Sequence, residues 1–180
     1  DGSTDKMEIA KELGEVLWYA TALGEKVGAL VVNDIFEATH NYAFDRSHCA
    51  GCILDSNPIQ TAVIKLSITI GSIQEMMKHT IMHKERFDKT RILVLLGDVH
   101  LQLATLATLH RFTIFDVAEL NAAKLAHRFN LKNGGSYSHE ASAKRHDAEV
   151  LFEHTKTYKQ LYSRITGNAV VINPDDVEVL

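Results

Sequence analysis

The sequence predicts an all-α fold, and three observations support this prediction. Apolar residues recur at intervals of three and four along long segments, which is typical of one face of a helix. The chain of 180 residues contains only two prolines, and clusters of turn residues are few. A pattern of paired helices also occurs twice, with a shift of 83 residues between the copies. These observations predict a helical bundle built from two related helix units.

The stretch from Asp88 to Arg128 shows the pattern most clearly. Its first helix has one apolar stripe and further leucines on its other faces, which is typical of a buried helix. Asp98 interrupts these apolar residues, so we expect its carboxylate to be paired, hydrogen-bonded or bound to a metal. A second helix is predicted to begin at Thr113-x-x-Asp116, a capping-box pattern. The apolar stripe consists of Ile92, Leu96, Val99, Leu103 and Leu106.

An earlier copy of the pattern becomes visible when this stretch is aligned with the sequence 83 residues before it. Gly97-Asp98 then aligns with Gly14-Glu15, and the apolar stripe aligns with Ile9, Leu13, Val16, Ala20 and Leu23. The repeat predicts five parts of the chain. They are a first half unit (1–46), a linker (47–61), a second unit (62–130), an extra C-terminal helix (139–166) and a tail (167–180).

Helices are expected at Asp5–Val27, Asn33–Arg46, Ala62–His83 and His139–Arg164, besides the central pair. Gly167-Asn168 is expected to end the last of them. The helix at Ala62–His83 has no counterpart in the first copy. Either a helix upstream of residue 1 is missing, or the first copy is naturally halved; the sequence leaves both open.

Composition narrows the function classes. The formal net charge is −4 with acids and bases interspersed, which argues against nucleic acid as a partner. No apolar run or leader pattern predicts membrane insertion or secretion. The two cysteines, Cys49 and Cys52, are too few for a secreted disulfide scaffold, so a cytoplasmic setting is expected.

Two groups of residues suggest metal ligands but have simpler interpretations. His48-Cys49-x-x-Cys52 offers up to three zinc ligands, yet no second Cys/His pair follows, and ordinary linker thiols are the favoured interpretation. His79 and His83 lie one helical turn apart and share a face. No third ligand accompanies them, so we favour surface or interface histidines.

Several spaced matches resemble the MazG-like nucleoside triphosphate pyrophosphohydrolases. Glu12-Leu-Gly-Glu15-Val-Leu-Trp18-Tyr19 is similar to the ELGDVLWY segment of that family, and Leu95-Leu-Gly-Asp98-Val is a weaker match. The segment from Asp116 to Arg128, with its Asn and Lys, resembles the following helix. Leu66–Lys78, with Gly71 and Glu75, resembles the helix that bears the EExxE motif. The resemblance covers about residues 5–46 and 62–130.

The resemblance implies an all-α fold that hydrolyses nucleoside triphosphates to a monophosphate and pyrophosphate with Mg²⁺. Members form dimers or tandem pseudo-dimers, so a homodimer or an internal pseudo-dimer is expected. Acids on facing helices suit Mg²⁺, which prefers oxygen ligands. The implied metal ligands are Glu12, Glu15, Glu75 and Asp98. Among them Glu12, Glu15 and Asp98 carry the catalytic role, and the implied substrate contacts are Asn121, Lys124, Arg128, Trp18 and Tyr19.

Departures from the family pattern leave three interpretations open. Thr69 and Ser72 stand near two expected acids of the EExxE motif, and Leu95 replaces the first acid of ExxD. Either copy one is catalytic and copy two contributes Asn121, Lys124 and Arg128, or a hybrid site joins Glu12 and Glu15 to Glu75 and Asp98. The third interpretation is an inactive helical module that binds a nucleotide or a protein partner.

Individual side chains have alternatives of their own. Trp18 and Tyr19 can stack on a base, although aromatic residues beside a buried helix more often belong to the core. Lys124 and Arg128 can clamp phosphate or pair with Glu119 and Asp116 on the same helix. His100 is expected to be a buried or interface histidine, because it faces away from Asp98.

Overall fold

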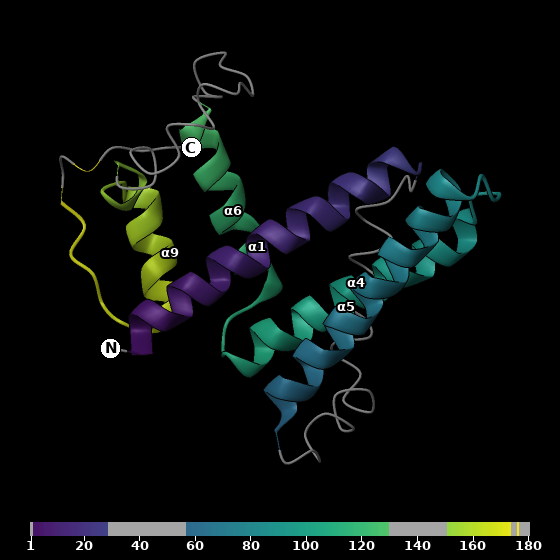
Figure 1. Cartoon of the computed structure of the whole chain (residues 1–180). Helices are drawn as coiled ribbons and strands as arrows, with labels where there is room; N and C mark the ends of the chain where they lie inside the picture. Colours follow the sequence, from purple (N-terminus) through teal and green to yellow (C-terminus); the bar gives the residue numbers. More distant parts are fainter. Residues whose placement is uncertain (1, 29–56, 130–150, 174–175, 177–180) are drawn as a thin grey trace. The chain divides into compact units, whose positions relative to one another are not determined.

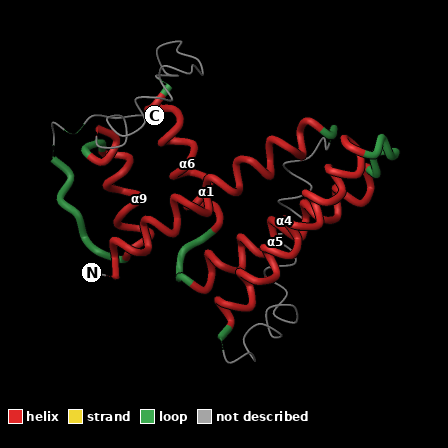
Figure 2. The backbone as a smooth tube through the Cα atoms, viewed as in Figure 1, coloured by secondary structure: helices red, strands yellow, loops and turns green. Residues whose placement is uncertain are grey.

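The computed structural model describes residues 2–28, 57–129, 151–173 and 176. The main elements in this part are helices, joined by loops and turns, and none of the described residues lies in a strand (Figure 2). The predicted all-α class is therefore confirmed. The five labelled helices are α1 (Gly2–Lys26), α4 (Pro58–Met82), α5 (Lys89–Leu109), α6 (Ile114–Arg128) and α9 (Lys156–Thr166).

The chain divides into two compact units. Unit 1 comprises Asp1–Glu15 and Arg111–Leu180, and unit 2 comprises Val16–His110. Helix α1 contributes its first residues to unit 1 and its remaining residues to unit 2. These units are defined by proximity in space, whereas the predicted repeat units are defined by sequence, so the repeat boundaries stay a prediction.

A hairpin of two helices dominates unit 2, with α4 and α5 side by side (Figure 1). Helix α4 begins at Pro58, four residues before the predicted start, because Asn57 caps it by accepting a hydrogen bond from the Gln60 backbone. Asp88 caps α5 in the same way. The predicted stripe of α5 is confirmed: Ile92, Leu96, Val99, Leu103 and Leu106 are all buried.

The other face of α5 corrects one expectation. Asp98 is exposed, and so is Val94, which precedes it by one turn. The helix therefore buries one face instead of its whole circumference, and water can solvate the carboxylate without a partner. By length and composition α5 is also long and apolar enough to span a membrane, a property shared by core helices; half of its most apolar stretch is buried.

Unit 1 contains α6 and α9, which are joined by an ion-pair network. The predicted capping box of α6 is present: Asp116 accepts hydrogen bonds from the Thr113 backbone and hydroxyl, and its own N–H donates to that hydroxyl. The Arg164 guanidinium of α9 contacts both Asp116 and Glu119. Asp116 and Glu119 thus pair with Arg164, whereas Lys124 pairs with Glu15 of α1.

The C-terminal helix is shorter than predicted. Residues 151–153 are helical, but the helix is interrupted at His154, and α9 begins after Thr155, whose hydroxyl accepts a hydrogen bond from the Tyr158 backbone. The single helix expected over His139–Arg164 is therefore wrong at this point. Gly167 ends α9 with φ +78°, as predicted, because glycine adopts the left-handed region without strain.

Several expectations fall outside the described residues. They include the helix at Asn33–Arg46, the linker thiols Cys49 and Cys52 with His48, and the first half of the predicted C-terminal helix.

Candidate functional site

Two residues of the predicted site, Glu15 of α1 and Lys124 of α6, meet where these helices cross within unit 1. A carboxylate oxygen of Glu15 lies 3.0 Å from the Nζ atom of Lys124. The Lys124 side chain is only 3 % exposed, whereas that of Glu15 is 27 % exposed. A buried ammonium needs a counter-charge, and Glu15 provides it while keeping contact with solvent.

Gly14 explains why these helices approach so closely. A Cβ atom placed on Gly14 would lie 2.9 Å from the Cβ of Asn121 and 3.3 Å from the Val117 carbonyl oxygen. Only glycine leaves room for the α6 backbone at this point. Asn121 is buried against this contact, and Lys124 follows it by one turn and reaches the next residue of α1, Glu15.

The remaining predicted residues of unit 1 border this crossing. Glu12 precedes Glu15 by three positions on α1 and is exposed. Arg128 follows Lys124 by one turn on α6 and is partly exposed. The structure therefore brings Glu15 into contact with Lys124, places Asn121 against the neighbouring Gly14, and leaves Glu12 one turn earlier on α1. We call Glu15, Asn121 and Lys124 the α1–α6 cluster.

The predicted aromatic residues are both exposed. Trp18 is 53 % and Tyr19 is 72 % exposed, so the core interpretation is wrong for both. An exposed indole and phenol are available to a ligand or partner, because neither ring is packed away.

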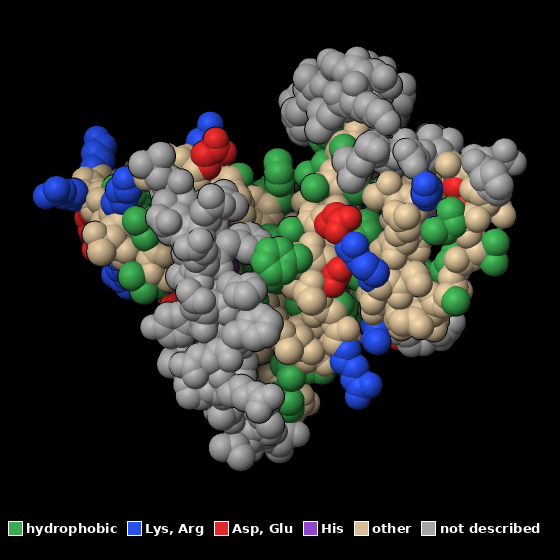
Figure 3. Space-filling model, turned by 180° about the vertical axis from the view of Figure 1, so that it is seen from behind, with side chains coloured by type: hydrophobic (Ala, Val, Ile, Leu, Met, Phe, Trp, Pro, Cys, Tyr) green, Lys and Arg blue, Asp and Glu red, His purple; other side chains and the backbone are tan. Residues whose placement is uncertain are grey.

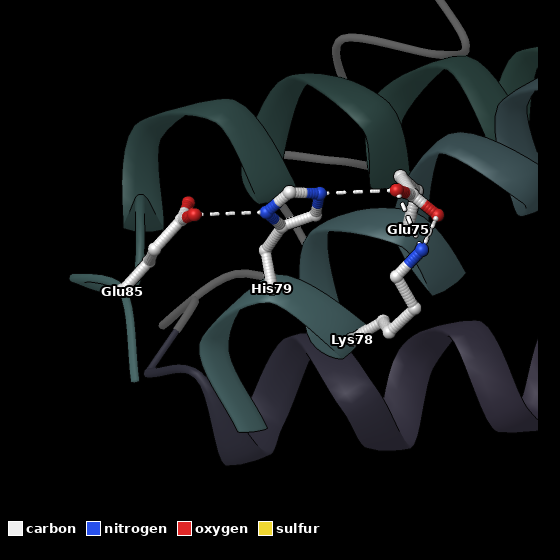
Figure 4. A network of polar contacts seen from close by, with 4 residues as sticks. All are labelled: Glu75, Lys78, His79 and Glu85. Atoms are coloured by element: carbon white, nitrogen blue, oxygen red, sulfur yellow. Dashed lines mark hydrogen bonds and ion pairs between the residues drawn. The ribbon is translucent and has the colours of Figure 1, made fainter. Parts of the chain in front are cut away.

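Unit 2 holds the other two predicted acids in different surroundings. Asp98 lies on the exposed face of α5. Glu75 of α4 accepts hydrogen bonds from Lys78 Nζ at 2.8 Å and from His79 Nε2 at 3.0 Å. His79 Nδ1 contacts Glu85 at 2.9 Å, so the four side chains form one polar network (Figure 4).

This network requires a protonated histidine. Both ring nitrogens of His79 face carboxylate oxygens, and two N–H donors exist only in the imidazolium form. Glu85 and then Glu75 raise the pKa of His79, while His79 lowers the pKa of Glu85. Lys78 and His79 lower the pKa of Glu75. His79 is therefore a surface histidine, as predicted, and it also forms ion pairs with Glu75 and Glu85.

Metal binding has mixed geometric support. Within the described ranges, no group of three or more His, Cys, Asp or Glu side chains is arranged to hold a metal ion. Glu12 and Glu15 share a helical face as two oxygen donors, which suits a cation that takes its other ligands from phosphate and water. Glu75 and Asp98 belong to the other unit, so their role as metal ligands stays a prediction.

His100 has a structural role, as expected. Its ring is buried, with Nδ1 donating to the Leu96 carbonyl oxygen at 2.7 Å and Nε2 lying 3.5 Å from the Thr21 hydroxyl. Burial lowers its pKa, so the neutral form is favoured.

Sequence reasoning missed Glu85, Arg86 and Arg91, which surround His79 at one end of the α4–α5 hairpin. The spacing of Glu75, Lys78 and His79 on one helix was visible in the sequence. Glu85 lies in the loop after α4, and the residue before it, Lys84, has a left-handed backbone (φ +56°). No short sequence motif predicts this conformation, so the contact between Glu85 and His79 was not predicted.

Comparison with known proteins found no match to this chain. No family model matches the chain, and no curated protein or solved structure is significantly similar to it.

Proposed function

We propose that this chain is a MazG-like, Mg²⁺-dependent nucleoside triphosphate pyrophosphohydrolase, organised as a pseudo-dimer of two related helix units. The single observation that supports this proposal best is the contact between Glu15 and Lys124. An acid from the first sequence copy meets a lysine from the second copy, as the interpretation with copy one catalytic requires.

The residues of the α1–α6 cluster have suitable chemistry for a triphosphate. Glu12 and Glu15 are carboxylates one turn apart with access to solvent, and they are the proposed ligands of Mg²⁺. When bound, Mg²⁺ supplies Lewis-acid polarisation of a phosphoryl oxygen and a lowered pKa of water. Asn121, Lys124 and Arg128 offer amide and cationic donors for phosphate oxygens.

The proposed reaction is attack of water on the α-phosphorus. The bond between that phosphorus and the bridging oxygen breaks, and pyrophosphate leaves as the monophosphate forms. Glu12, the more exposed acid, takes the proton from water. Lys124, which contacts Glu15, would stabilise the negative charge that develops on the phosphate, and exposed Trp18 and Tyr19 are proposed to stack on the base.

A hybrid site is the second form of this proposal. In it Glu75 and Asp98 complete the metal ligands, and a homodimer or the internal repeat supplies the facing helices. Two carboxylates alone make a sparse site, which favours this form. Asp98→Asn tests it, because exposed Asp98 has no role in packing and its loss should abolish activity only in the hybrid site. Full activity in this variant would reject the hybrid site and leave the form in which copy one is the catalytic copy.

A different function class remains as the alternative: an inactive helical module that binds a nucleotide or a protein. The observation in its favour is that Glu15 neutralises a lysine that is almost fully buried, a purely structural use of the same pair. An activity assay discriminates between the enzyme and the binding module, since the same fold can serve either function.

The test is Mg²⁺-dependent release of pyrophosphate from a panel of ribo- and deoxynucleoside triphosphates, with EDTA as the blank. We expect release that EDTA stops and that Glu12→Gln abolishes, because Glu12 is exposed and its substitution disturbs no packing. Glu25→Gln is the matched control on the exposed surface of the same helix. Release unaffected by Glu12→Gln would reject the proposed site, and no release from a folded chain would favour the binding module.

A further inference from the structure

A cavity of about 670 Å³ lies within unit 2, where the end of α4, the following loop and the start of α5 come together. Apolar side chains of Ile68 and Met76 line part of it. Apart from glycine and two hydroxyl side chains, the rest of the lining is titratable or charged: Glu75, His79, Glu85, Arg86, Asp88 and Arg91. Lys and Arg side chains gather at this loop end of the hairpin, at the left in Figure 3.

The acids of the cavity are already engaged. Glu75 accepts hydrogen bonds from Lys78 and His79, and Glu85 contacts the other ring nitrogen of His79. Asp88 accepts a hydrogen bond from the Arg91 backbone as the cap of α5. Each carboxylate therefore has a donor from the protein itself.

The two arginines differ from the acids in this respect. Arg86 and Arg91 are exposed, and among the residues that the structure describes no acid lies at ion-pair distance from either guanidinium. Two guanidinium groups thus line a cavity whose carboxylates already have hydrogen-bond donors of their own. Arginine is well suited to bind phosphate, because its planar donors match pairs of phosphate oxygens.

We propose that this cavity is a binding site for a small phosphate-bearing anion, with Arg86 and Arg91 as its anchors. The anion is bound through phosphoryl oxygens, and the wall formed by Ile68 and Met76 accommodates an attached organic group. The proposal is independent of the proposed function, since it requires neither Mg²⁺ nor catalysis.

The test is calorimetric titration of the full chain with inorganic pyrophosphate, in EDTA and low salt. We expect binding that weakens at least about tenfold in the Arg86→Gln/Arg91→Gln variant, because charge-assisted hydrogen bonds are lost. Lys84→Gln is the matched control: it removes one positive charge from the same loop, at an exposed position that does not line the cavity. It should leave the affinity within about twofold.

Three outcomes would overturn the proposal. They are no binding of pyrophosphate by the folded chain, equal affinity in the arginine variant, and an equal loss in Lys84→Gln, which would mean diffuse attraction to a basic loop. Titration of Arg128→Gln separates this site from the proposed active site, because Arg128 is a proposed phosphate contact there and its loss should leave binding of pyrophosphate to the cavity unchanged. A nucleoside triphosphate titrated under the same conditions shows whether the organic group adds affinity.

Discussion

The ammonium group of Lys124 on α6 is almost fully buried and lies 3.0 Å from the carboxylate of Glu15 on α1, which reaches solvent. This asymmetry predicts unequal effects of removing each partner. Glu15→Gln leaves a buried charge uncompensated and should lower the free energy of unfolding by about 3 kcal/mol. Lys124→Met should cost less, about 1 kcal/mol, because Glu15 can be solvated. Chemical denaturation of both variants measures the difference.

The double variant provides the control for this pair. Glu15→Gln combined with Lys124→Met should recover most of the stability lost in Glu15→Gln alone, since no buried charge remains. Equal losses in the two single variants, with no recovery in the double variant, would show that the pair is not the reason for either loss.

Gly14 and Gly97 occupy equivalent positions in the predicted sequence repeat but have different surroundings, so we expect their substitution by alanine to change stability in opposite directions. Alanine at Gly14 would place a Cβ 2.9 Å from that of Asn121, so Gly14→Ala should destabilise the fold by about 1–3 kcal/mol. Apart from its chain neighbours and the nearby backbone of α5 itself, no atom lies within 4 Å of a Cβ placed on Gly97. Gly97→Ala should therefore stabilise α5 by roughly 0.5–1 kcal/mol, because alanine is the better helix former. Thermal unfolding measures both.

A second substitution tests the cause. Asn121→Ala keeps a Cβ and should not rescue Gly14→Ala, whereas Asn121→Gly removes the clashing atom and should restore part of the stability. Destabilisation by Gly97→Ala of the same size as that by Gly14→Ala would show that crowding between α1 and α6 is not the cause of the loss at Gly14.

The burial of His100 leads us to expect that the free energy of unfolding decreases in mild acid. Burial lowers its pKa in the folded chain, while the unfolded chain binds the proton at the ordinary value of 6.5. As pH falls below 6.5, the unfolded state therefore gains protons that the folded state resists, and stability falls. His100→Asn, which retains a side-chain N–H for the Leu96 carbonyl, should show a flatter dependence of unfolding free energy on pH. Parallel curves for the two proteins would contradict this role.

Local patterns in the sequence predicted the helices well. The apolar stripe of α5, the capping box at Thr113 and the stop at Gly167 are all present, because each depends on residues within one or two turns. The interruption at His154 was missed, since the apolar pattern continues through it and only the cap formed by Thr155 marks the new start. Exposure of Asp98 was missed for a related reason: periodicity does not show how much of a helix neighbouring elements cover.

The candidate site was predictable only in part. The resemblance to the MazG-like family predicted Glu15 and Lys124 as site residues, and these two side chains do meet. Their burial and the role of Gly14 depend on how closely two distant helices cross, which no spacing along the chain records. Likewise, Glu85 joins the His79 network through a loop, so its contact depends on tertiary structure.

His79 allows the two uses of Glu75, as an ion-pair partner and as a metal ligand, to be compared in one measurement. Glu85 and Glu75 both raise its pKa, with Glu85 the larger cause. In a titration of the His79 ring followed by nuclear magnetic resonance, we expect a pKa above 6.5. Glu85→Gln should lower this pKa more than Glu75→Gln does, and Glu25→Gln should leave it unchanged.

Repeating this titration with Mg²⁺ tests the hybrid site. If Glu75 binds the cation, its carboxylate is no longer shared with His79, and the pKa of His79 should fall toward the value found in Glu75→Gln. If Glu75 is solely the partner of Lys78 and His79, millimolar Mg²⁺ should leave the pKa where it was. The first outcome would place Glu75 among the metal ligands. The second would remove it, and the hybrid site with it, because Asp98 alone cannot complete the cation's ligands in unit 2.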